Sequence, residues 1–131
     1  MKQREIKFRV WDKSQNKFLD YPCYFNNKDF NEFTAFDRYF KCDEEGCILQ
    51  QYTGLKDKNG REIYEGDIVQ YNRRSSYDGI NFEVKWSEDN WGWVLVSKNK
   101  DYLVNERTPE GYRYEFIEIV GNIFENPDLL K

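Results

Sequence analysis

The stretch from Ile80 to Val96, INFEVKWSEDNWGWVLV, predicts a β-hairpin. Its first half alternates apolar with polar residues, as a strand with one buried face does. The apolar positions on that face are Ile80, Phe82, Val84 and Trp86. The polar run 87–90 predicts the turn, and residues 91–96 predict the returning strand. The two strands therefore belong to an antiparallel sheet.

The chain from Ile68 onward repeats this pattern. Four or five short strands follow one another at spacings of roughly 10–15 residues, with polar turns between them. The sequence contains 10 Phe, 10 Tyr and 4 Trp but a single Ala, Ala35, which favours strands over helices. We therefore expect a mostly β protein with at most short helices, whose C-terminal part is a small antiparallel barrel or roll.

A second alternating stretch lies near the N-terminus, at residues 5–11. The side chains expected on its inner face are Ile6, Phe8 and Val10, and those expected in solvent are Lys7 and Arg9. The polar residues that follow predict a turn at 12–17 and a returning strand. We expect an N-terminal β-hairpin region over residues 1–50 and a barrel region over 51–131, sharing one core. Residues 26–45 fit either a short amphipathic helix or a strand.

The residue types in this sequence do not favour an enzyme. The sequence has no histidine, which excludes Ser-His-Asp and Cys-His catalysis and any histidine-containing metal site. It also has no glycine-rich phosphate-binding loop. The three cysteines, Cys23, Cys42 and Cys47, lack the spacing of a zinc site, and we expect them to be free thiols. We therefore expect no enzyme, no cofactor and no metal.

The charge of the chain argues against a broad nucleic-acid surface. The net charge is −4, and all of it lies in the second half, from Asp67 onward. A domain that binds nucleic acid is normally basic. The N-terminus carries no apolar targeting segment, and no stretch has the length of a membrane span, so we expect a cytoplasmic protein with no membrane partner.

Two residue sets are candidate binding sites. The first interleaves aromatic and basic residues on a predicted loop, a composition that suits single-stranded nucleic acid: Tyr71, Arg73, Arg74 and Tyr77. The second is a possible exposed recognition loop: Tyr52, Thr53, Lys56 and Lys58. The alternative for the second set is a folding role, with tight turns at 53–54 and 59–60 and the apolar residues beneath. The nearby tryptophans Trp86, Trp91 and Trp93 are most simply expected in the core.

Three segments together resemble the YopX family, which phages and prophages of Gram-positive bacteria encode. They are EIKFRVWD at residues 5–12, QYTGLKDKNGREIYEGDIV at residues 51–69 and VGNIFENPDLL at residues 120–130. The resemblance implies a C-terminal SH3-like β-barrel, and it implies no activity and no catalytic residues.

Together, the residues and the resemblance predict a phage or prophage protein that acts by binding rather than by catalysis. We expect a protein-interaction module, with a protein partner or a second copy of itself. A nucleic-acid-binding accessory protein that uses the aromatic and basic loop is the alternative.

Overall fold

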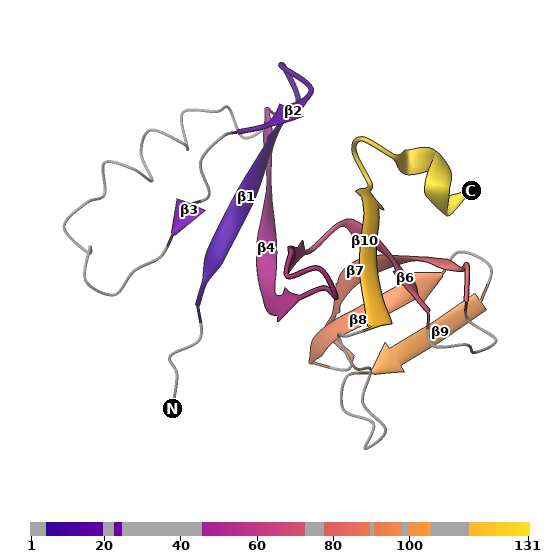
Figure 1. Ribbon diagram of the computed structural model, residues 1–131. Helices are drawn as coiled ribbons and strands as arrows, with labels where there is room; N and C mark the ends of the chain where they lie inside the picture. Colours follow the sequence, from indigo (N-terminus) through magenta and orange to yellow (C-terminus); the bar gives the residue numbers. More distant parts are fainter. Residues whose placement is uncertain are drawn as a thin grey trace. The chain divides into compact units, whose positions relative to one another are not determined.

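The computed structural model describes residues 5–19, 23–24, 46–72, 78–89, 91–97, 100–105 and 116–131. The chain is mostly β, as the sequence predicts (Figure 1). Its elements are β1 (Lys7–Asp12), β2 (Lys17–Phe18), β3 (Cys23–Tyr24), β4 (Cys47–Lys56), β5 (Glu62–Tyr64), β6 (Asp67–Tyr71), β7 (Asn81–Ser87), β8 (Gly92–Ser97), β9 (Lys100–Asn105), β10 (Ile117–Asn122) and the 3-10 helix η2 (Pro127–Leu130). None of the described residues forms a helix long and apolar enough to cross a membrane.

The chain divides into two compact units, Met1–Gly54 and Leu55–Lys131. The division falls inside β4, four residues after the boundary expected from the sequence, and a core shared by the two parts stays a prediction. In the first unit, β1 pairs antiparallel with β4 along one edge and with both β2 and β3 along the other. The N-terminal hairpin, predicted from the strand at residues 5–11 and the turn at 12–17, therefore exists, although the described part of its returning strand, β2, is short.

One expectation for β1 is wrong: its basic side chains do not form a solvated face. Lys7 is buried, and its Nζ lies 4.7 Å from the centroid of the Tyr52 ring and 3.4 Å from a carboxylate oxygen of Glu5. Arg9 lies over the Phe18 ring at 4.4 Å and donates an Nε hydrogen bond to Gln50 at 2.8 Å. Aromatic faces and a glutamine oxygen on neighbouring strands stabilise these cations away from water. Alternation alone could not reveal those partners.

The turn between β1 and β2 is held by the carboxylate of Asp12. Its Oδ1 accepts hydrogen bonds from the Ser14 hydroxyl at 2.6 Å, the Ser14 N–H at 2.8 Å and the Gln15 N–H at 3.2 Å. These bonds, the Ser14 hydroxyl first among them, hold the pKa of Asp12 below its ordinary value of 3.8. The ionised carboxylate therefore contributes stability above pH 3.8, and this contribution is lost as the pH falls through the lowered pKa.

We therefore expect acid to weaken the wild-type protein more than Asp12→Asn, which keeps an Oδ1 acceptor but cannot be protonated. The urea midpoint of each protein, measured at pH 7 and again at pH 3, checks this. The advantage of the wild type should shrink at the lower pH. An equal difference between the two proteins at both pH values would contradict the role given to the ionised carboxylate.

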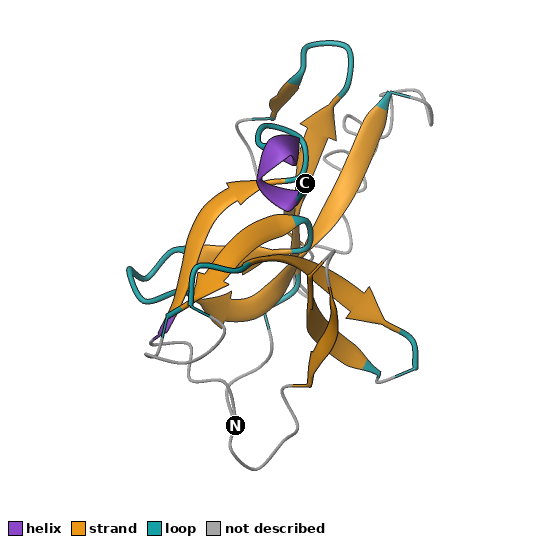
Figure 2. Cartoon of the chain, turned by 90° about the vertical axis from the view of Figure 1, so that its right-hand side faces the viewer, coloured by secondary structure: helices purple, strands orange, loops and turns teal. Residues whose placement is uncertain are grey.

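The second unit contains a five-stranded antiparallel sheet in the order β10-β6-β7-β8-β9. The sheet curls strongly, in the manner of half a barrel, which agrees with the expected SH3-like barrel (Figure 2). The hairpin predicted at residues 80–96 is confirmed, because β7 and β8 pair with Trp86 opposite Trp93. The buried core lines one side of the sheet: Ile63, Val69, Tyr71, Phe82, Val84, Trp93, Ile117 and Ile119.

Candidate functional site

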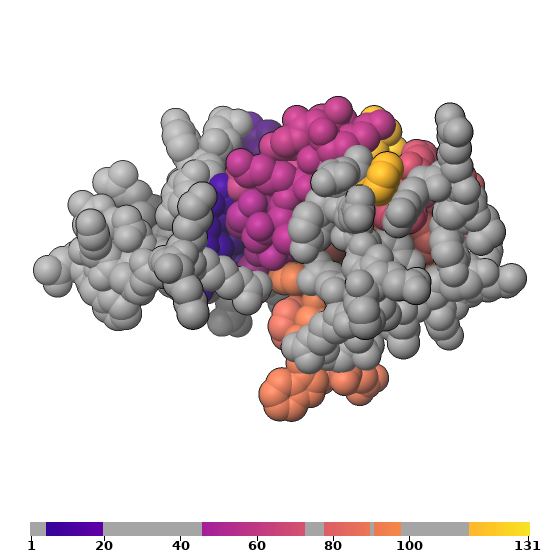
Figure 3. All heavy atoms as spheres, turned by 60° about the horizontal axis from the view of Figure 1, so that its bottom comes forward, coloured from indigo at the N-terminus to yellow at the C-terminus, as the bar shows by residue number. Residues whose placement is uncertain are grey.

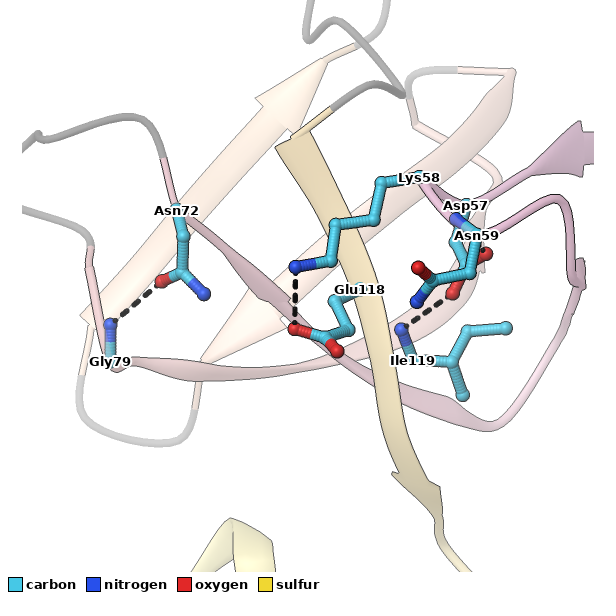
Figure 4. A network of polar contacts seen from close by, with 7 residues as sticks. All are labelled: Asp57, Lys58, Asn59, Asn72, Gly79, Glu118 and Ile119. Atoms are coloured by element: carbon cyan, nitrogen blue, oxygen red, sulfur yellow. Dashed lines mark hydrogen bonds and ion pairs between the residues drawn. The ribbon is translucent and has the colours of Figure 1, made fainter.

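The turn at residues 57–61 is fastened to β10 through Asp57 (Figure 4). The carboxylate of Asp57 is buried, and its Oδ1 accepts hydrogen bonds from the N–H groups of Asn59 and Arg61, both at 2.9 Å. Its Oδ2 accepts the N–H of Ile119 at 3.1 Å. The Lys58 N–H also donates to the carbonyl of Ile117 at 2.8 Å. The turn thereby satisfies main-chain groups on the outer edge of β10, which is an end strand of the sheet.

This geometry favours the folding role for the residues between 51 and 69. The tight turn predicted at 53–54 is wrong, because both residues continue β4, although Gly54 has a φ of +87°. Tyr52 and Thr53 lie in β4 and are buried, whereas Lys56 and Lys58 are exposed. The Nζ of Lys58 lies 3.0 Å from a carboxylate oxygen of Glu118, an exposed ion pair of small energetic weight. The structure therefore does not place all four residues of this candidate set on an exposed loop.

The aromatic and basic candidate set is described only in part. Tyr71 lies in β6 and is 6% exposed, and its ring meets that of Phe116 edge to face at 6.2 Å. A base could not stack on this buried ring. Arg73, Arg74 and Tyr77 lie outside the described residues.

Two further turns in the family-like segments have the same construction. Asp67 is buried and its Oδ2 accepts the Tyr64 N–H at 2.8 Å. Asn122 accepts the N–H groups of Phe124 and Glu125 through its side-chain oxygen, at 3.0 and 2.9 Å. Each of these side chains replaces a missing main-chain acceptor, as Asp and Asn do in turns. None of Asp57, Asp67 and Asn122 is among the candidate residues predicted from the sequence, although an Asp two residues before Asn-Gly is a recognisable turn signal.

Two exposed tryptophans stand at the end of the β7–β8 hairpin. Trp91 is 77% exposed and Trp86 is 48% exposed, so the expectation that the tryptophans enter the core holds only for Trp93, at 7%. Trp86 packs edge to face on Trp93, with 5.2 Å between ring centroids. The orange part of the chain, which holds β7 and β8, protrudes at the bottom of the view in Figure 3. We call Trp86, Trp91 and the turn residues Glu88 and Asp89 the tryptophan tip.

The backbone of Trp91 is in an unfavourable conformation. Its φ is +51°, in the left-handed region that bulky residues rarely adopt. The Trp91 N–H closes the turn with a hydrogen bond of 3.4 Å to the Glu88 carbonyl. A residue at such a position normally is glycine or asparagine. The chain here combines backbone strain with a large apolar side chain in water, and strain of this kind often marks a functional position.

We expect Trp91→Gly to leave the free energy of unfolding unchanged or to raise it by up to about 1 kcal/mol, because glycine removes the left-handed strain and loses little burial. Chemical denaturation measures the difference. Trp93→Ala is the contrast, since removal of this buried ring should cost about 3–5 kcal/mol. A loss of more than about 1 kcal/mol in Trp91→Gly would mean that the Trp91 side chain stabilises the fold, which contradicts this assignment.

The tryptophan tip is acidic. Residues 81–97 contain one lysine, Lys85, against three carboxylates, which gives a net charge of −2. Lys85 is paired with Glu83, at 3.2 Å between Nζ and Oε2. Glu88 and Asp89 are exposed, and neither forms an ion pair with another described residue. The two indoles are therefore accompanied by two exposed carboxylates that are unpaired within the described part of the chain.

Among the described residues, no three potential ligands (His, Cys, Asp or Glu side chains) are gathered as a metal ion would require. Cys47 is disulfide-bonded, so the expectation of three free thiols is wrong at this residue. Sequence spacing could not reveal this bond, because pairing depends on how the folded chain brings two sulfur atoms together.

These features define a small β protein whose turns are capped by buried acidic and amide side chains and whose β7–β8 hairpin presents exposed indoles. The chain belongs to the YopX family, whose model matches residues 7–131. In fold it is similar to the crystal structure of protein EF1440 from Enterococcus faecalis, with a TM-score of 0.57 and 24% sequence identity over 96% of this chain and 98% of that one. None of the curated proteins matches the chain.

Proposed function

We propose that this protein is a non-enzymatic protein-interaction module that binds its partner through the tryptophan tip. The observation that carries the proposal is Trp91, which is 77% exposed and held at a positive φ. Exposed apolar residues are common on protein surfaces, but a strained backbone under one of them is not. Tryptophan is among the residues most enriched at the energetic centres of protein interfaces.

Two further observations support this class of function. Trp86 lies on the same hairpin as Trp91 and packs edge to face with the buried Trp93, so a partner would meet a ring that is already positioned. The absence of histidine removes the commonest general acid and base from the whole chain.

The two alternatives from the sequence receive less support. Nucleic acid would meet an acidic tip, and Tyr71, one of the proposed stacking residues, is buried. Self-association through the tip would bring Glu88 and Asp89 of one copy against the same carboxylates of the other, which is unfavourable. A different protein is therefore the better partner.

An affinity purification from host cells, with nuclease treatment, tests the proposal in its first step. Wild type, the double variant Trp86→Ala/Trp91→Ala and the control Leu129→Ala serve as baits. Leu129 is an exposed apolar residue whose carbonyl accepts a hydrogen bond from Asn81, at the end of β7 away from the tip. Any protein retained by wild type and control but not by the double variant is then purified and titrated by calorimetry.

We expect the purified partner to bind the double variant at least tenfold more weakly than wild type, a loss of about 1.4 kcal/mol or more. Equal affinity for the two would reject the tip as the binding surface. Retention that disappears with nuclease would favour the nucleic-acid alternative, and catalytic turnover of a substrate by the pure protein would reject the non-enzymatic class.

We also propose that the protein is a phage or prophage product that works in the cytoplasm of its host. The disulfide of Cys47 is unusual for that compartment, because cytoplasmic thiols are kept reduced. Alkylation of thiols in intact cells, before lysis, tests whether the protein works in the cytoplasm. Labelling of Cys23, Cys42 and Cys47 alike would support a cytoplasmic protein, and protection of Cys47 together with one other cysteine would contradict it.

A further inference from the structure

We infer that the tryptophan tip recognises a basic and apolar peptide segment, one that combines Lys or Arg with apolar side chains. This inference rests on the proposed function and names the chemistry of the partner. It follows from the arrangement of charge and aromatic surface on one hairpin.

The charge of the tip selects a cation. Lys85 is already paired with Glu83, whereas Glu88 and Asp89 form no ion pair with a described residue. Both carboxylates lie in the turn that directly precedes Trp91. A Lys or Arg that approaches Trp91 therefore meets negative charge, while a phosphate, an acidic peptide or an anionic lipid surface is repelled.

The indoles add a second attraction for the same cation. A tryptophan face is the best aromatic partner for Lys or Arg, worth about 0.5–1 kcal/mol at an exposed site and more when water is excluded. The first unit of this chain shows the same contact twice, with Lys7 over Tyr52 and Arg9 over Phe18. The apolar residues of the partner would cover the indole surface of Trp86 and Trp91 that the cation leaves uncovered. These two residues are the large exposed hydrophobic side chains of the described hairpin.

Three synthetic peptides of 10 residues test the inference. The first alternates Arg with Leu, the second replaces every Arg with Glu, and the third replaces every Leu with Ser. Each is titrated into the full-length protein at low salt and followed by tryptophan fluorescence and by calorimetry. A single-stranded oligonucleotide of equal length is titrated in parallel.

Two double variants distinguish attraction by the carboxylates of the tip from attraction by the net charge of the whole protein. Glu88→Gln/Asp89→Asn removes the two carboxylates of the tip, and Glu125→Gln/Asp128→Asn removes two exposed carboxylates elsewhere in the second unit. Both variants change the net charge by the same amount. Attraction of the Arg peptide to the acidic protein as a whole would affect them equally.

We expect the Arg-Leu peptide to bind at least tenfold more tightly than the Glu-Leu and Arg-Ser peptides. Glu88→Gln/Asp89→Asn should weaken it about fivefold, Glu125→Gln/Asp128→Asn by less than twofold, and Trp86→Ala/Trp91→Ala at least tenfold.

Equal weakening by the two charge variants, tighter binding of the Glu-Leu peptide, or tighter binding of the oligonucleotide would each overturn the inference. These results would not by themselves reject the proposed function. If a natural partner depends on Trp86 and Trp91 but the peptide preference is reversed, the interaction module stands and only its basic and apolar specificity is wrong.

Discussion

Asp57→Ala is expected to lower the free energy of unfolding by about 4 kcal/mol, the largest effect that we expect of any turn residue in the described part of the chain. The substitution removes the acceptor of three main-chain N–H groups, those of Asn59, Arg61 and Ile119. The bond to Ile119 is buried, and its donor would be left without a partner away from water. Hydrogen bonds to a charged group contribute about 1.5–3 kcal/mol each, and their loss here is not independent because one carboxylate makes all three.

Urea denaturation monitored by circular dichroism measures the effect. Lys58→Ala is the matched control, because it removes only the exposed ion pair to Glu118 from the same turn and should change stability by less than about 0.5 kcal/mol. Asp57→Asn should fall between the two, since its amide keeps one acceptor oxygen. If Asp57→Ala costs no more than Lys58→Ala, the turn does not fasten β10.

Gly121→Ala is expected to cost about 2–3 kcal/mol, because no room exists for a methyl group at this point of β10. A Cβ at Gly121 would lie 2.6 Å from Oδ1, 2.8 Å from Cγ and 2.9 Å from Cβ of Asn126. Asn126 cannot move freely, since its Oδ1 accepts the Asn122 N–H at 3.3 Å and its own N–H donates to the Asn122 carbonyl at 2.9 Å. The added methyl group must therefore disturb the loop that leads into η2.

The comparison for this prediction is Gly79→Ala. Gly79 has a φ of +81° but open space around the missing side chain, so its substitution should cost only the strain of the left-handed backbone, about 1 kcal/mol. The double variant Gly121→Ala/Asn126→Ala should lose less than the sum of the two single losses, because the second change removes Oδ1 and Cγ, the two atoms nearest the added methyl group, and leaves only the Asn126 Cβ at 2.9 Å. Strict additivity in this cycle would contradict the steric explanation.

These two predictions assign the family-like segments to folding. Asp57 lies in the segment 51–69, and Gly121 and Asn126 lie in the segment 120–130. In both, a side chain closes a turn and holds it against the curled sheet. The tryptophan tip lies outside both segments, in the hairpin between them. The side chains that close these turns and the candidate binding surface thus lie in different parts of the sequence, although the β7–β8 hairpin also contributes Phe82, Val84 and Trp93 to the core.

The sequence predicted the elements that depend on local pattern. The hairpin at residues 80–96 followed from alternation and from a polar turn, and its register places the expected apolar residues on the core face as far as Val84. Trp86 continues the alternation but comes at the end of the strand, where the core stops, and so it is half exposed. A periodic pattern indicates which face of a strand is buried. It does not indicate at which residue the core that buries this face ends.

Contacts between distant residues could not be predicted in the same way. The bond from Ile119 to Asp57 spans 62 positions, and Lys7 is buried because the Tyr52 ring on another strand lies beneath it. The left-handed backbone of Trp91 contradicts the preference of its residue type, so propensity argued against it. The candidate site was missed for this reason: the rule that places tryptophan in the core is correct for Trp93 and fails at the strained position two residues before it.

The most direct test of the account is a calorimetric titration of the purified natural partner into wild type and into Trp91→Gly. This substitution removes the exposed indole while preserving or raising stability, so a change in affinity cannot be attributed to unfolding. We expect a Kd at least tenfold higher for Trp91→Gly at unchanged or greater stability. The same Kd for both proteins would contradict the claim that this protein binds through its exposed tryptophans.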